Sequence, residues 1–152
     1  MKRKLNVFTI GVILVGAVFY LYPNKSIEDR LWMYKYNPNV DGYYFTDGEG
    51  YYFSSEENSL YIYSDIDKKF DTEKCVMSKD LGPSRSLGRY TINDDNVRVT
   101  RTSPDDRQDE KEYDFSIKYK HDTILWGCQF SQIQLTLNKD KSKEVYTLYS
   151  PK

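Results

Sequence analysis

Histidine and cysteine are scarce in this sequence, which has one histidine, His121, and two cysteines, Cys75 and Cys128. A catalytic triad or a zinc site needs partners that one histidine, set between Lys120 and Asp122 in a predicted turn, does not have. The Gly-x-Ser-x-Gly and His-Glu-x-x-His motifs are also missing. We therefore expect no enzymatic activity, no metal and no cofactor. His121 is predicted to be a surface residue, with pH sensing as the alternative.

Acidic residues are absent before Glu28, and the chain begins with a basic tip followed by an apolar run. The tip is residues 1–4 (MKRK), and the run of 18 residues from Leu5 to Tyr22 has only Asn6 and Thr9 as polar interruptions. At about 1.5 Å per helical residue the run reaches about 27 Å, close to the hydrocarbon thickness of a bilayer. The basic tip predicts a cytoplasmic N-terminus.

Residues 5–22 are thus predicted to be a transmembrane anchor, and residues 23–152 to lie on the far side of the membrane. The alternative is a cleaved signal peptide, for which Val15-Gly16-Ala17 supplies small residues. The apolar run continues beyond that point through Leu21, which favours the anchor.

Charge is not concentrated anywhere beyond the anchor. Residues 23–152 carry 19 basic and 23 acidic side chains, a net charge of −4, which argues against a nucleic-acid partner. Two groups of acidic residues lack the spacing of a calcium-binding loop and are interpreted as solvated loops. They are Asp65, Asp67 and Asp71, and Asp105, Asp106, Asp109 and Glu110.

Tyrosine is abundant, with 15 in all and 13 of them after residue 22, whereas alanine is rare. Tyrosine suits half-buried strands, so residues 41–152 are predicted to form an all-β domain. About nine short antiparallel strands with tight turns indicate a small barrel or sandwich. Residues 42–46 and 50–54 are predicted to form a hairpin around Asp47-Gly48, since this dipeptide favours tight turns. A second hairpin is predicted to turn at residues 93–95.

Residues 23–40 are predicted to hold a short helix and a linker. Ser26 and Asp29 have the spacing of a capping box, and apolar residues recur at helical spacing up to Tyr36. Asn37-Pro38 would end this helix beside the membrane.

Apolar residues alternate with polar ones between residues 113 and 130, and they are the candidate core or ligand-facing residues. Ile124, Trp126, Cys128 and Phe130 are predicted to share one face of a single strand. The alternation changes parity near Ser131, which predicts a bulge or a bend there. The candidates are Tyr113, Phe115, Ile117, Tyr119, Ile124, Trp126 and Phe130.

Two cysteines in an exported domain are predicted to pair, so we expect a Cys75–Cys128 disulfide. Closing a loop of about 50 residues would stabilise the fold by about 4 kcal/mol in the chain-entropy description. The alternative is two reduced, buried cysteines.

Several features together resemble the ToxS family and its relatives VtrC and PsaF/MyfF. They are the N-terminal anchor, Leu31-Trp32 just beyond it, the hairpin from Gly88 to Thr100 (GRYTINDDNVRVT), and the turn that joins Leu135-Thr136-Leu137-Asn138 to Val145-Tyr146-Thr147-Leu148. The resemblance implies a single-pass protein of the bacterial inner membrane with a lipocalin-like periplasmic domain.

The same resemblance implies a partner, the periplasmic segment of a membrane-bound, ToxR-type transcription activator. The implied function is to stabilise that activator and to help it sense a small amphipathic signal, as part of a heterodimer. We further expect an open strand edge that the partner would complete. The alternatives are a self-contained lipocalin-like ligand carrier and an immunity protein against an envelope toxin.

Overall fold

The computed structural model describes residues 26–35, 45–102, 110–138 and 143–152. The predicted cytoplasmic tip (1–4) and anchor (5–22) lie outside these residues. Within the described part, no helix is long and apolar enough to cross a bilayer.

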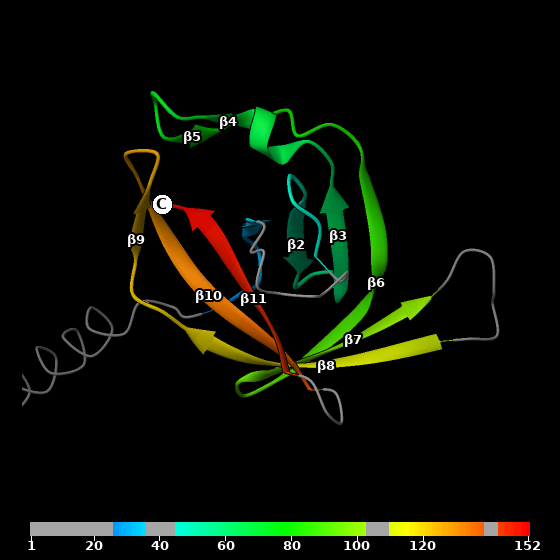
Figure 1. Ribbon diagram of the computed structural model, residues 1–152. Helices are drawn as coiled ribbons and strands as arrows, with labels where there is room; N and C mark the ends of the chain where they lie inside the picture. Colours follow the sequence, from blue (N-terminus) through cyan, green and yellow to red (C-terminus); the bar gives the residue numbers. More distant parts are fainter. Residues whose placement is uncertain (1–25, 36–44, 103–109, 139–142) are drawn as a thin grey trace, which may run out of the picture.

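Eight antiparallel strands close into a barrel (Figure 1). Their order is β1-β2-β3-β6-β7-β8-β10-β11, and β11 returns to pair with β1. The all-β prediction is confirmed, and of the two predicted architectures the chain forms the barrel. The strands are β1 (Leu31–Tyr34), β2 (Gly50–Ser54), β3 (Ser59–Tyr63), β6 (Ser84–Asn93), β7 (Asn96–Thr102), β8 (Glu110–Tyr119), β10 (Cys128–Asn138) and β11 (Lys143–Pro151).

Three shorter strands and one turn of 3-10 helix lie outside the barrel wall. They are η1 (Ile66–Lys69), β4 (Phe70–Asp71), β5 (Val76–Met77) and β9 (Thr123–Leu125). Figure 1 shows η1, β4 and β5 above one end of the barrel, near the tip of the β9–β10 hairpin.

The helix predicted over Ser26 to Tyr36 is wrong, because Leu31–Tyr34 is the barrel strand β1. Apolar residues at Trp32 and Tyr34 face the interior, and β1 pairs with both β2 and β11. The pairing of β1 on both sides outweighs the local helical spacing, and the barrel thus begins within the segment predicted as a linker.

The hairpin predicted around Asp47-Gly48 is also wrong for its described part. Phe45 and Thr46 are not in a strand, and β2 has β1 on one side and β3 on the other. Residues 42–44 lie outside the described residues. The predicted hairpin at residues 93–95 is confirmed, because β6 and β7 pair up to Asn93 opposite Asn96.

The segment predicted as one strand from 123 to 130 is instead two strands. Trp126 and Gly127 have φ of 53° and 80°, the left-handed pair typical of a type I′ turn. This turn folds β9 back onto β10, so that Ile124 pairs with Gln129 and lies on the opposite face from Cys128 and Phe130.

The bulge predicted near Ser131 is wrong. The pairing of β10 with β11 runs without a break from Phe130 opposite Pro151 to Asn138 opposite Lys143. The parity changes because β10 is buried on different faces at its two ends. Ile133 and Leu135 point into the barrel, whereas Cys128 and Phe130 point outward beneath η1, β4 and β5.

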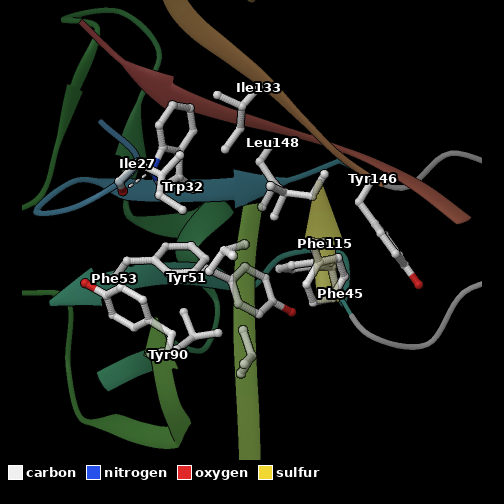
Figure 2. Packing of buried hydrophobic residues seen from close by; sticks show 14 of the residues in the cluster. Ile27, Trp32, Phe45, Tyr51, Phe53, Tyr90, Phe115, Ile133, Tyr146 and Leu148 are labelled. Carbon is white, nitrogen blue, oxygen red and sulfur yellow. Dashed lines mark hydrogen bonds between the residues drawn. The ribbon is translucent and has the colours of Figure 1, made fainter. Parts of the chain in front are cut away.

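The barrel interior is filled by the chain's own apolar side chains (Figure 2). Phe45 enters from outside the strands, and its ring centroid lies 4.6 Å from that of Tyr51 and 4.9 Å from that of Tyr146. At the other end Trp32 donates its indole N–H to the Ile27 carbonyl at 2.8 Å. Side chains of the barrel strands, together with Phe45, therefore fill the barrel interior.

A second, smaller group of buried residues lies outside the barrel wall, and we call it the outer cluster: Met33, Ile66, Phe70, Cys128 and Phe130. Residues 66–77, which we call the cap, cover it. The predicted disulfide is present and ties Cys75 of the cap to Cys128 of β10, with 5.4 Å between their Cα atoms. The cap is thus fastened to the outer face of the barrel.

Each of the eight barrel strands has a neighbour on both sides. The expectation of an open edge in the barrel is therefore wrong, because β1 and β11 close it with backbone pairs such as Met33 opposite Tyr149. Within the described residues, the barrel is thus closed by strand pairs of the chain itself.

Gly88 supports closure where β6 bends, at the register shift opposite Leu60 and Tyr61. A Cβ at Gly88 would lie 2.1 Å from the Thr100 carbonyl oxygen, and its φ is +154°. Gly88→Ala should therefore lower the free energy of unfolding by about 3 kcal/mol, the upper end for overpacking. Urea unfolding of the full chain measures this.

Gly82→Ala is the matched control. Gly82 also has a positive φ, but a Cβ there would meet nothing within 4 Å. Its cost should be only the conformational one, about 1 kcal/mol. Equal losses for the two variants would contradict the close approach at Gly88.

Candidate functional site

The candidate core residues separate into three groups. Phe115, Ile117 and Phe130 are buried, and Tyr113 and Tyr119 pack half-buried against the core. Ile124 and Trp126 are 73% and 53% exposed, so their prediction as core residues is wrong. The tight turn at Trp126-Gly127 is the reason. The glycine in the Trp126-Gly127 dipeptide could have indicated this turn in the sequence, because type I′ turns favour glycine.

An apolar hollow of about 200 Å³, which we call the outer groove, runs between the cap and the barrel wall. Its floor comes from β1 and β11, one side from the cap and the other from the β9–β10 turn. The lining residues are Met33, Tyr34, Lys35, Asp47, Gly48, Glu49, Ile66, Asp67, Phe70, Leu125, Trp126 and Tyr149.

Trp126 forms one wall of the outer groove. Its ring centroid lies 6.2 Å from that of Phe70 and 5.9 Å from that of Phe130, and Lys35 Nζ stands 5.4 Å from the Trp126 ring centroid. These contacts hold the indole in place while half of it stays exposed. Tyr149 lies on the floor, and burial raises the pKa of its phenol, which therefore stays neutral.

The conformation of Trp126 is unusual for its residue type. At φ 53° it lies in the left-handed region, where a side chain other than glycine, asparagine or aspartate costs about 1–2 kcal/mol. Type I′ turns strongly favour Asn-Gly at their centre. A half-exposed tryptophan at this point is therefore kept at a cost in folding free energy.

A second, open cavity of about 580 Å³ lies where β8 ends, and we call it the basic mouth. Its lining includes four cationic side chains and one carboxylate. Arg30 donates to Ser131 Oγ at 3.1 Å and lies over the Trp32 ring, and Lys152 pairs with Asp122. The lining residues are Ser26, Arg30, Trp32, Lys118, Tyr119, Lys120, His121, Asp122, Ser131, Gln132, Ile133 and Lys152.

Tyr119 in the lining and Glu28 nearby contribute to the electrostatics of the basic mouth. Burial, with the charges of Asp95 and Glu28, raises the pKa of Tyr119, so its phenol is uncharged at neutral pH. Glu28 itself accepts a hydrogen bond from Tyr90 Oη at 2.9 Å. His121 is exposed on the rim, as predicted, but the hairpin turn predicted there is wrong, because both β8 and β9 pair with β10 and not with each other.

Among the described residues, no group of three or more His, Cys, Asp or Glu side chains could hold a metal ion. Asp65 pairs with Lys68 at 2.6 Å, and this hydrogen bond lowers the pKa of Asp65. Asp71 accepts hydrogen bonds from the backbone of Lys74 and Glu73, which lower its pKa. Asp105, Asp106 and Asp109 lie outside the described residues.

The fold and the two cavities are the features from which a function is inferred below. No family model matches the chain, and no curated protein or solved structure matches it.

Proposed function

We propose that the chain is a membrane-anchored interaction protein whose barrel presents the outer groove to a second protein. The partner is the periplasmic segment of a ToxR-type transcription activator held in the same bacterial inner membrane. The features that resemble the ToxS family support this partner. The observation that carries the proposal is Trp126, half exposed in the left-handed region at the wall of an apolar groove.

Trp126 strains the backbone, yet it is a type of side chain that binds strongly at protein interfaces. Residues in strained backbone positions persist where function requires them. Tryptophan is the residue type most enriched among those that dominate binding energies at interfaces. Asparagine would suit the turn better, and the packing of the indole on Phe70 and Phe130 does not require its exposed half, which is left for binding.

The outer groove also offers a binding site for a small amphipathic signal molecule. It is open to solvent in the described chain, so a partner laid across it would convert it into a shared, apolar pocket. Lys35 at its edge would face the charged end of such a molecule. A ligand that binds only the covered pocket would tighten the complex by mass action.

The carrier alternative is less favoured because the barrel interior already holds the chain's own rings. Phe45, Tyr51, Phe115 and Tyr146 contact one another at the centre. A ligand inside the barrel would have to displace them.

Trp126→Asn tests the proposal. Asparagine fits the turn, so the free energy of unfolding should change by less than about 1 kcal/mol. Binding to the activator's periplasmic segment should weaken by about 30-fold or more, the loss expected for a central tryptophan of an interface. The measurement is co-purification of the two full-length proteins from one membrane, with a titration of the activator segment against the reconstituted chain.

Val76→Asn is the matched control, because Val76 is an exposed apolar residue that does not line the outer groove. It should leave the complex intact. Retention of the activator by Trp126→Asn, or no complex with the unchanged chain, would show that the outer groove is not the binding surface.

A further inference from the structure

The basic mouth lies where the described chain emerges from the predicted anchor. Ser26 lines the mouth, and only residues 23–25 separate it from Tyr22, the last residue of the apolar run. Four extended steps of about 3.5 Å reach at most about 14 Å. If residues 5–22 span a bilayer, as the proposed function requires, the mouth cannot lie far from the lipid headgroups.

The charge of the mouth matches such a surface. Arg30, Lys118, Lys120 and Lys152 line it, against Asp122 alone, although the whole chain has a net charge of −1. Asp122 is paired with Lys152. The cations are therefore a local excess, and such an excess attracts anionic phospholipids.

An apolar side chain accompanies these cations. Ile124 is 73% exposed on β9, where it pairs with Gln129, and the Gln129 carbonyl accepts the Lys152 N–H at 3.2 Å. Ile124 thus lies on the same sheet face as Lys152, beyond the rim of the mouth. An exposed aliphatic residue beside lysines is the arrangement of an interfacial membrane contact.

We propose that this end of the barrel rests on the bilayer. The cations of the basic mouth bind the phosphates of anionic phospholipids, and Ile124 enters the interfacial layer. The anchor then holds the domain against the membrane in one orientation, with the mouth toward the lipid. This proposal rests on the anchored placement of the proposed function but not on the activator or the outer groove.

The experiment places a photoreactive amino acid at position 124 or position 76 of the full chain, reconstituted in lipid nanodiscs. Val76 is the matched position, because it is 51% exposed and belongs to the cap. Discs contain phosphatidylcholine with or without phosphatidylglycerol. We expect lipid adducts from position 124 and none from position 76. In discs that contain phosphatidylglycerol, Lys118→Gln with Lys120→Gln should abolish the adducts at an unchanged melting temperature.

Each outcome decides between the two proposals. A chain that inserts into discs but gives no adduct at position 124, or equal adducts at both positions, overturns the membrane contact and leaves the anchor in place. Adducts that are indifferent to phosphatidylglycerol and to the lysines overturn the role of the cations. A chain that is not retained by the discs overturns the anchored placement and this contact together.

Discussion

Replacing Cys75 and Cys128 together by alanine should lower the free energy of unfolding by about 4 kcal/mol, the chain-entropy value for a loop of this length. The two residues are 53 apart, and their bond joins the cap to the barrel. Beyond the bond, the cap is held by the outer cluster, in which the Phe70 and Phe130 ring centroids are 5.2 Å apart, and by the hydrogen bond from Ile66 N–H to the Gly48 carbonyl at 2.7 Å.

The loss of stability should be greatest in the cap. Amide exchange in β4 and β5 should accelerate far more than in β6 and β7, because the cap can open while the barrel stays closed. Denaturant unfolding and hydrogen exchange measure the two effects. Val76→Ala, on the same cap but exposed, should change stability by less than about 0.5 kcal/mol. Unchanged exchange in the cap of the double variant would show that the outer cluster alone fastens it.

Phe45→Ala should lower the free energy of unfolding by about 3–5 kcal/mol, the range for removing a buried phenylalanine. Phe45 is 3% exposed and its ring contacts those of Tyr34, Tyr51, Phe115 and Tyr146. Its truncation leaves a cavity lined by aromatic rings. Thermal unfolding with and without benzene should show a recovery of stability on binding, because apolar cavities of this kind stay dry and take up apolar molecules.

Phe45→Leu is the matched control, since leucine keeps most of the volume and should cost less than about 1.5 kcal/mol. A Phe45→Ala variant as stable as the unchanged chain would mean that this residue does not fill the barrel.

The sequence was informative where local pattern and tertiary structure agree. Alternation from Tyr113 to Tyr119 correctly predicted β8 with Phe115 and Ile117 inward. The turn at residues 93–95 and the cysteine pair were also predicted correctly. The strand and the turn depend on neighbouring residues, and two cysteines allow only one pairing, so one sequence suffices to see these features.

The sequence was misleading where one signal has two physical causes. The parity change after Phe130 looked like a bulge, but it arises because the cap buries the outer face of β10 at that end. Nothing local to β10 reveals the cap. Similarly, the helical spacing after Ser26 is overridden by the pairing of β1 on both sides.

The candidate site was found only in part. Trp126 was predicted as a core or ligand-facing residue, and it is half exposed, has a left-handed backbone and lines the outer groove. The outer groove joins residues from β1, the cap, the β9–β10 turn and β11. Such a surface depends on topology, which alternation alone does not determine.

The pairing of β1 with β11 determines when the barrel can close during folding. Met33 pairs with Tyr149, 116 residues later, so the last seam of the barrel can form only after β11 has been synthesised. Until then β1 and β10 each expose a row of unpaired backbone groups. Contacts so distant in sequence form slowly, so the period between synthesis and closure is the time at which the protein is most accessible to chaperones, proteases and misassembly.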